Sequence, residues 1–159
     1  GLMTRADLNH QVVRAAVYDK LTRLEADLAQ LIRIKYRDPW TWIDRLNEKA
    51  QARTLGYWEL SKRRNIDLDP IVALTLAQLI NIVAQSRGLR GELAYKSRKE
   101  FDEATGRFAD TRNRVMHPIR PLVLGSADIA QLAETLKAIN DLQTKVDDAL
   151  KKRRQESVS

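Results

Sequence analysis

Hydrophobic residues recur at alternating steps of four and three positions early in the chain, at Val17, Leu21, Leu24, Leu28 and Leu31. This spacing places them along one stripe of an α-helix, with polar side chains outside the stripe. The last part of the chain repeats the pattern, with a stripe that consists of Ile129, Leu132, Leu136, Ile139, Leu142, Val146 and Leu150. No segment alternates with period two over a useful length, so we expect an all-α protein.

Two Asp-Pro pairs between these stripes predict further helix starts, because Asp can cap a helix and Pro is favoured in its first turn. The pair at Asp69 precedes residues 71–83, which are apolar on nearly every side and are expected to form a central buried helix. The pair at Asp38 opens a segment that contains three tryptophans, Trp40, Trp42 and Trp58. We expect Gly56 to interrupt this segment.

Gly88 and Gly91 predict a break, after which one long helix is expected over residues 92–116. Proline disfavours helical geometry in the residue before it, so Pro118 and Pro121 should end this helix. We expect Ser126 to cap the last helix. The inner stripe of the long helix consists of Phe101, Ala104, Phe108 and Val115. Together these segments predict an up-and-down bundle of four to five main helices.

The chain has 159 residues, which suffices for one domain with a buried core. We expect this helical domain to span residues 9–150 and the basic residues 151–159 to form a flexible tail. The chain has no cysteine, which excludes disulfides, thiolate metal sites and a cysteine nucleophile. His10 and His117 are its two histidines and lie far apart in the sequence, so we expect no metal site and no cofactor.

No apolar run approaches the roughly 18 residues that a membrane span requires, and no signal-peptide pattern opens the sequence. The absence of cysteine also suits a reducing compartment, so we expect a cytoplasmic protein without a membrane partner.

The formal charge is +7, from 28 Lys and Arg against 21 Asp and Glu. A basic surplus of this size favours a polyanion partner, either nucleic acid or anionic lipid. A merely solvated surface is the alternative. Between Arg87 and Arg120, nine basic residues stand against five acidic ones, so this third of the chain carries most of the surplus.

The chain opens with the residues Gly1-Leu2-Met3-Thr4-Arg5-Ala6-Asp7-Leu8 and has no methionine at position 1. An apolar pair followed by Thr-x-x-Asp-Leu resembles the last strand and following turn of a CBS domain. In that family the residues matching Thr4 and Asp7 contact the ribose or phosphate of an adenine nucleotide. The resemblance implies that residues 1–8 are the remnant of an upstream CBS domain, and that a nucleotide would bind only through its missing part. Alternatively, Thr4 or Asp7 caps the helix that follows.

One local pattern carries chemistry, and it closes the long helix with the residues Arg112-Asn113-Arg114-Val115-Met116-His117-Pro118. Arg112 follows Phe108 by four residues and so continues the inner stripe, where a guanidinium needs an anionic or hydrogen-bonding partner. Pro118 disturbs the helix at His117, so the imidazole can leave the helical path and converge with Arg112 on a small anion. Arginine can hold a phosphate bidentately, and histidine moves protons near neutral pH.

This order of Arg, Asn, three further residues and His resembles the R-x4-6-H motif of HEPN domains. Those domains are all-α bundles of four or five helices that carry the motif late, near the end of a long helix. The resemblance covers residues 8–150: an opening helix, a Trp-rich segment, an apolar central helix and a motif helix. Some members use an additional acidic or polar residue on an earlier helix, which the sequence does not identify. Glu25, Glu92 and Asp110 could assist the motif, but the expected role of each is to pair with a nearby base on the surface.

The resemblance implies a metal-independent endoribonuclease that works as a homodimer, with the two motifs facing each other. His117 would act as general base or acid at the ribose 2′-hydroxyl and the leaving 5′-oxygen. Arg112 would stabilise the charge on the scissile phosphate, and Asn113 would orient His117 or the phosphate. Arg114 and Arg120 flank the motif and would bind the RNA backbone. Many relatives act in defence or stress as toxins gated by a fused sensor, a role that an upstream CBS domain would fit.

Two other hypotheses stay open. One is a non-catalytic HEPN module that dimerises and binds nucleotide or RNA, with Arg112 and His117 forming a structural network. The other is a helical spacer appended to a CBS sensor. The tryptophans could stack on bases, but core or dimer packing is the expected role, because they lie beside Ile43, Leu46 and Leu55.

Overall fold

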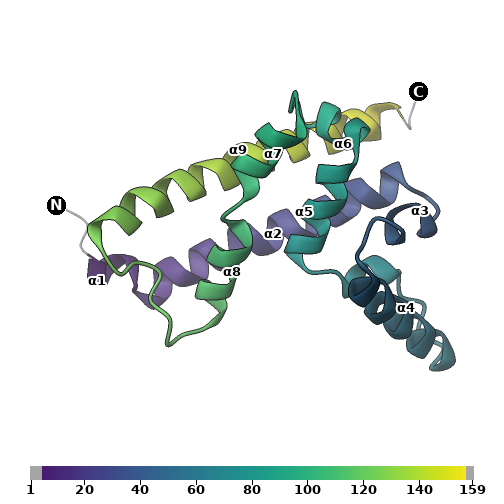
Figure 1. The fold of residues 1–159 in the computed structure, drawn as a ribbon, viewed down its shortest axis with the longest axis horizontal. Helices are drawn as coiled ribbons and strands as arrows, with labels where there is room; N and C mark the ends of the chain where they lie inside the picture. Colours follow the sequence, from purple (N-terminus) through teal and green to yellow (C-terminus); the bar gives the residue numbers. More distant parts are fainter. Residues whose placement is uncertain (1–4, 157–159) are drawn as a thin grey trace.

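The computed structural model describes residues 5–156 of the chain, and this part contains helices but no β-strand, which confirms the expected all-α bundle. Figure 1 shows the long helices α2 and α9 crossing the molecule side by side, with the shorter helices arranged on and around them. The elements in chain order are α1 (Arg5–Leu8), α2 (Gln11–Lys35), α3 (Trp40–Ile43), α4 (Glu48–Arg63), the 3-10 helix η1 (Pro70–Ala73), α5 (Leu76–Gln85), α6 (Arg87–Glu92), α7 (Arg98–Thr105), α8 (Phe108–Met116) and α9 (Ser126–Glu156).

The core lies where the predicted stripes of α2 and α9 are buried. The α2 stripe is buried over its full length, and burial of each leucine contributes about 1.5–3 kcal/mol relative to exposure. In the α9 stripe, Ile129 and Leu136 are partly buried and the other five members are buried. Lys20 of α2 bonds Asn140 of α9, and Arg23 bonds Asp147, so the two helices run in the same direction.

Helix α2 is the central element, because α5, α8, α9 and η1 all pack against it. Helix α4 instead packs chiefly on η1 and projects at the end of the molecule where α2 finishes (Figure 1). Helices α2, α5, α8 and α9 thus build the main body, and α3 and α4 form an extension at one end, attached to the core through Trp42, Ile43 and Ala50.

The predicted break at Gly56 is wrong, because α4 runs through it. The chain leaves the helical path over residues 44–47 instead, and Asn47 then caps α4 by accepting a hydrogen bond from the backbone N–H of Ala50 at 2.9 Å. A side chain at position 56 would meet no atom within 4 Å. Glycine on such an open face costs a helix only about 1 kcal/mol relative to alanine, which packing on η1 can offset.

The central buried helix begins later than predicted. The Asp-Pro pair does start a helical turn, in which Asp69 accepts a hydrogen bond from the N–H of Ile71, but this turn is only η1. Helix α5 begins at Leu76 because Thr75 and Gln78 form a capping box, in which each side chain satisfies the other residue's backbone N–H. Its buried residues are Leu76, Leu79, Ile82, Val83 and Ala84.

The expected break at Gly88 and Gly91 is also displaced, since both glycines lie within α6. The chain turns at Ala94, whose φ of 55° is left-handed, while the N–H of Tyr95 bonds the carbonyl of Arg90 across the helix end. This C-cap pattern usually uses glycine, so the sequence gives no signal for it. It separates α6 from the segment that carries the motif.

The long helix predicted over residues 92–116 is two helices, α7 and α8, which meet at Gly106. The predicted inner stripe nevertheless holds, because Phe101, Phe108 and Val115 are buried and Ala104 is partly buried. Helix α8 ends at Met116, directly before His117 and Pro118, as expected.

Ser126 is the first residue of α9 rather than its cap. Asp128, in the first turn of α9, accepts hydrogen bonds from the N–H groups of Leu124 and Gly125, which precede the helix. These bonds hold the pKa of Asp128 below its ordinary value. At the other end, α9 continues through Glu156, so residues 151–156 of the expected flexible tail are helical. The physical reason is an ion pair of 2.6 Å that ties Arg153 to Glu92 of α6.

Part of the CBS resemblance lies outside the described residues, because Thr4 belongs to residues 1–4. Asp7 lies in the single turn of α1. Asp7 does not cap α2, because His10 takes that role: its Nδ1 accepts a hydrogen bond from the N–H of Val12. The predicted cap at Thr4 lies outside the described residues. None of the helices within residues 5–156 is long and apolar enough to span a lipid bilayer.

Candidate functional site

Helix α8 lies along α2 with its buried residues Phe108, Thr111 and Val115 turned to the core. The two helices are antiparallel, because Arg112 contacts Glu25 whereas the later residue His117 contacts the earlier residue Arg14. The motif therefore extends along α2 from its middle towards its N-terminal end.

The side chain of Arg112 is half-buried and forms an ion pair with Glu25. Its Nε lies 2.9 Å from Oε2 of Glu25, and its Nη2 lies 3.5 Å from Oε1. Nε and Oε2 are close but poorly aligned, so neither atom has a hydrogen-bond partner within residues 5–156. The guanidinium is thus charge-compensated while it keeps donors for a further acceptor.

This pairing bears on two sequence-based expectations. Glu25 was expected either to assist the motif or to pair with a nearby base on the surface, and its partner is the motif arginine, 87 positions away in the sequence. The requirement for an anionic group beside Arg112 is met by this carboxylate. Spacing along one helix indicates that Arg112 faces inward, but it does not indicate which residue of α2 it meets.

His117 is the residue at which the chain leaves α8. Its φ of −106° and ψ of 101° are extended, as the following proline favours. The side chain is exposed and makes no hydrogen bond or ion pair with any other described residue. Its backbone carbonyl, by contrast, accepts hydrogen bonds from Arg14 at 2.7 Å and from the N–H of Arg120 at 2.9 Å. The loop is fixed, and the imidazole is open to solvent.

Arg14 is a residue of the candidate site to which the sequence gives no pointer. Its guanidinium donates to the carbonyls of Arg114 and Val115 in the last turn of α8, and to those of His117 and Arg120 in the loop that follows. The last carbonyls of a helix have no partner within the helix and need a donor from elsewhere. The sequence shows that such a donor is needed, but not that Arg14 supplies it.

Asn9 holds the far side of the same loop. Its Oδ1 accepts hydrogen bonds from the N–H groups of Leu122 and Val123, at 2.7 and 3.0 Å, and its Nδ2 donates to the carbonyl of Val123. Arg14 and Asn9 together attach both ends of the loop after α8 to the start of α2. They fix where His117 is presented.

Arg112 and His117 do not share one cleft. Arg112 lines a cavity of about 570 Å³ between α2, η1 and α5, together with Tyr18, Glu25 and Arg33. A second cavity, of about 590 Å³, lies at the end of α8 and is lined by Arg14, Tyr18, Met116 and Pro118. Tyr18 lines both cavities, so they adjoin along α2. The motif lies on the border between the two cavities.

The other predicted site residues lie around this border. The side chains of Asn113 and Arg120 are exposed. Arg114 forms an ion pair of 2.9 Å with Asp110, one turn earlier on α8. The expectation that Asp110 pairs with a nearby base is therefore confirmed. Glu92 pairs with bases from other helices, Arg153 of α9 and Lys35 of α2.

Within the described part of the chain, no three histidine or carboxylate side chains come together as a metal site would require. Comparisons with protein-family models, with curated proteins and with solved structures find no match to this chain.

Proposed function

We propose that this chain is a metal-independent endoribonuclease domain that acts as a homodimer. The observation that carries the proposal is the contrast at the two ends of the motif. Arg112 is half-buried and held by Glu25, whereas the imidazole of His117 is exposed on a loop that Arg14 fixes. One end thus presents a fixed cation, and the other presents a group that can take and give protons.

In this reaction the ribose 2′-oxygen attacks the adjacent phosphorus and the bond to the 5′-oxygen breaks. His117 removes the 2′-hydroxyl proton or protonates the leaving 5′-oxygen, and the products are a 2′,3′-cyclic phosphate and a 5′-hydroxyl. Arg112 stabilises the charge that builds on the phosphate, and Asn113 orients His117 or the phosphate. Arg114 and Arg120 bind neighbouring phosphates, and the nucleophile belongs to the substrate.

A second copy of the chain completes the site. The surface around His117 is unusually apolar for one that faces solvent. Ile119 is 93% exposed and Met116 is 46% exposed, and the exposed side chains of Val12 and Tyr18 lie nearby on α2. Burial of these side chains by the same face of a partner would bring the motifs together across a twofold axis. Arg112 of one copy and His117 of the other then reach one phosphate, although they line no common cleft within one chain.

The ion pair of Arg112 with Glu25 favours a second candidate function. A guanidinium whose charge is already compensated can act as a structural tie between α8 and α2, as in a non-catalytic HEPN module that dimerises and binds RNA or nucleotide. In that case Arg112 contributes to stability alone.

The two candidates are separated by incubating labelled RNA with the purified domain in EDTA. We expect cleavage in the chelator, with a cyclic phosphate at the 3′ end of the product. His117→Ala should slow cleavage by about 10²-fold or more, and Arg112→Ala by about 10²- to 10³-fold. Arg112→Lys keeps the charge beside Glu25 but cannot hold phosphate bidentately, so it should lose most activity while it keeps most stability.

Arg23→Ala is the matched control, because Arg23 also forms an ion pair from α2, with Asp147, but lies on the side of α2 that faces α9. It should cleave as the wild type does. Wild-type protein that is dimeric by light scattering and leaves RNA intact would contradict the enzyme and favour the binding module.

The dimer itself is tested with Ile119→Asp, which places a charge at the most exposed apolar residue of the surface around His117. We expect the variant to be monomeric by light scattering, folded by circular dichroism and inactive. A wild-type monomer that cleaves RNA at full rate would show that the site needs no partner.

A further inference from the structure

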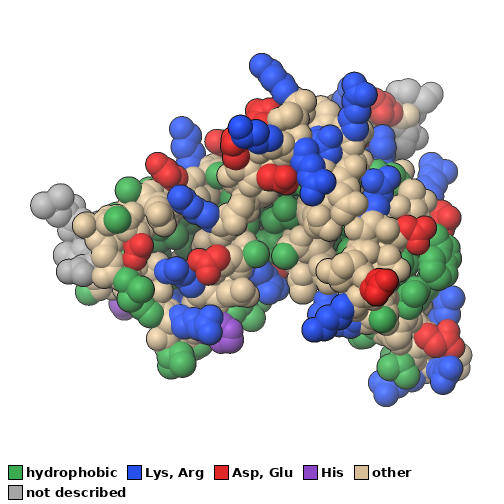
Figure 2. Space-filling model, in the orientation of Figure 1, with side chains coloured by type: hydrophobic (Ala, Val, Ile, Leu, Met, Phe, Trp, Pro, Cys, Tyr) green, Lys and Arg blue, Asp and Glu red, His purple; other side chains and the backbone are tan. Residues whose placement is uncertain are grey.

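The extension formed by α3 and α4 carries aromatic side chains on its surface. Trp42 is buried, as expected for a core residue, but Trp40 is 49% exposed. Trp40 lies against Trp58 of α4, with ring centroids 6.2 Å apart and planes tilted by 59°. The Nζ of Lys62 lies 4.0 Å from the centroid of the Trp58 ring. Figure 2 shows hydrophobic and basic side chains beside one another at this end of the molecule.

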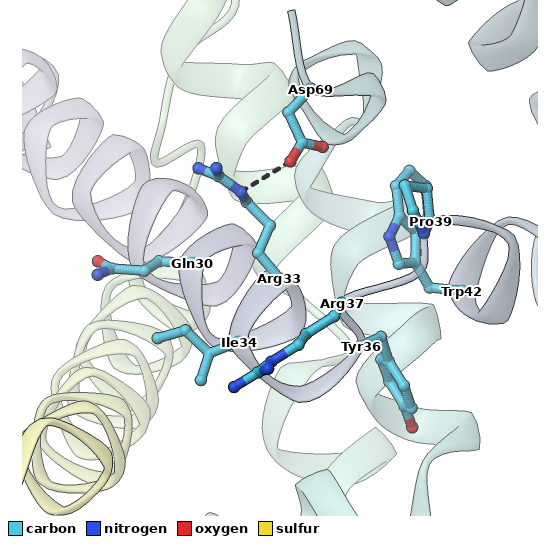
Figure 3. Close-up of a pocket in the computed structure, with 8 residues that line it drawn as sticks. All are labelled: Gln30, Arg33, Ile34, Tyr36, Arg37, Pro39, Trp42 and Asp69. Carbon is cyan, nitrogen blue, oxygen red and sulfur yellow. Dashed lines mark ion pairs between the residues drawn. The ribbon is translucent and has the colours of Figure 1, made fainter. Parts of the chain in front are cut away.

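A cleft lies at the base of this extension, where α2 gives way to α3 (Figure 3). It has a volume of about 490 Å³, and Arg33, Arg37 and Pro39 are among its lining residues. Arg33 forms an ion pair of 2.8 Å with Asp69, whereas the guanidinium of Arg37 has no ion-pair partner among the described residues. Trp40 directly follows Pro39, so the cleft and the tryptophan pair adjoin.

The same cleft continues towards the motif. Gln30 and Arg33 line both this cleft and the one that contains Arg112. Glu25, the partner of Arg112, precedes Arg33 by eight residues on α2, a distance of about 12 Å along the helix axis. The surface beside α2 therefore runs from Arg112 through Arg33 to Arg37 and Pro39, the residue that precedes Trp40.

The charge of the extension indicates which kind of partner fits it. From the start of α4 to the residue after its end, five basic side chains stand against Glu48 and Glu59, and Glu59 is already paired with Arg63. A second copy of the chain would bring the same positive charge to this end, which disfavours self-association here. The basic residues are Lys49, Arg53, Lys62, Arg63 and Arg64.

We propose that this surface is the path of a single-stranded RNA, with bases stacked at the Trp40–Trp58 pair and the phosphate backbone led along Arg37 and Arg33 to Arg112. Exposed aromatic rings beside basic side chains are the combination with which proteins hold single strands. The flexible stem of Lys62 lets its ammonium move from the Trp58 ring to the phosphate of a stacked base. The inference rests on the proposed function, for which it names the substrate class.

The stacking pair favours an unpaired strand over a duplex. In a duplex the face of each base is covered by its neighbours, so an exposed tryptophan has no base face to contact. The inferred path therefore predicts that single strands bind more tightly than the same sequence in a duplex.

Binding is measured by fluorescence anisotropy of a fluorescein-labelled oligoadenylate, with all variants built on His117→Ala so that the RNA stays intact. We expect Trp40→Ala and Trp58→Ala each to weaken binding by about five- to a hundred-fold. Arg37→Ala should lower the slope of log Kd against log salt by about one. Annealing oligouridylate to the probe forms a duplex, and the parent protein with both tryptophans should bind this duplex more weakly than the single strand.

Two exposed residues serve as controls, Tyr57, which lies about 100° around α4 from Trp58, and Lys137 on α9. Tyr57→Ala and Lys137→Ala should bind as the parent does. Thermal unfolding of each variant verifies the fold. The inferred path would be overturned if both tryptophan variants were folded and bound RNA with unchanged affinity. It would also be overturned if the substitutions changed the oligomeric state but not the affinity for RNA.

The experiment separates this inference from the proposed function. If the wild type binds single strands through the tryptophans but does not cleave them, the path stands and the nuclease fails. If the tryptophan substitutions leave binding unchanged on the His117→Ala background and leave cleavage unchanged in a chain that keeps His117, the nuclease stands and the path fails.

Discussion

Arg112 and Glu25 illustrate what single residues contribute to this site. A guanidinium on the inner side of a helix requires a partner, and the sequence predicts that requirement from the four-residue step after Phe108. The partner itself comes from α2, and its identity follows from the antiparallel packing of α8 on α2. The same packing brings Arg14 to the carbonyls at the end of α8.

Arg14 gives a testable prediction at this scale. Arg14→Ala removes a charged donor from four carbonyls, and we expect it to lower the free energy of unfolding by about 1–2 kcal/mol. Because those bonds hold the loop that presents His117, RNA cleavage should fall as well. Denaturation in urea measures the first effect.

The matched control for this change is again Arg23→Ala, since Arg23 lies on the same helix but is 63% exposed and bonds only side chains of acidic residues. Its loss should change stability by at most about 0.5–1 kcal/mol. Equal effects of the two substitutions would contradict the assigned role of Arg14.

At the scale of elements, side-chain caps set the starts of α4 and α5, and three of the glycines do not interrupt their helices. Asn47 and the Thr75–Gln78 capping box start α4 and α5, whereas Gly56, Gly88 and Gly91 lie inside helices. A cap satisfies backbone donors that would otherwise lack a partner, and so it fixes a helix start. An interior glycine only weakens a helix, by an amount that packing can offset.

Gly56→Ala should therefore stabilise the protein, by about 0.5–1 kcal/mol, because alanine favours the helix and the added methyl meets no atom within 4 Å. Thermal unfolding measures the gain. Gly106→Ala is the contrasting change, since its Cβ would lie 3.1 Å from the carbonyl oxygen of Asp102, and it should give no gain. A loss of stability in Gly56→Ala would show that α4 does bend or end at this position.

At the scale of the whole molecule, Glu92 joins three helices that are distant in sequence. It lies in α6 and pairs with Arg153 of α9 at 2.6 Å and with Lys35 of α2 at 3.1 Å. Partial burial acts to raise the pKa of Glu92, but the hydrogen bonds from Arg153 and Lys35 outweigh it and hold the pKa below its ordinary value of 4.5.

This shift predicts how stability depends on pH. A carboxylate whose pKa is lower in the folded than in the unfolded chain stabilises fully above the unfolded pKa, and the contribution is lost as pH falls through the folded pKa. Glu92→Gln should therefore lower Tm at neutral pH, and its difference from the wild type should shrink below about pH 4.5. Glu134→Gln, at an exposed pair with Arg107, should differ little at any pH. A difference for Glu92→Gln that stays constant with pH would contradict this account.

The sequence by itself determined the class of the fold and the faces of its main helices. The spacing of leucines predicted which sides of α2 and α9 are buried, and the phenylalanines of α7 and α8 lie inside as expected. Such patterns are local, because burial of one face follows from the helical repeat alone. Pro118 likewise predicted the end of α8, since its effect on the preceding residue needs no tertiary contact.

Only the tertiary structure decided which residues from distant segments meet. The way in which the helices cross determines three features of the site. These are the ion pair of Arg112 with Glu25, the hydrogen bonds from Arg14 to the loop that contains His117, and the continuity of the clefts along α2. It also decided that Trp42 is buried while its near neighbour Trp40 is exposed beside Trp58. The physical reason is that these contacts are fixed by packing between helices, which many sequences of the same periodicity can satisfy in different ways.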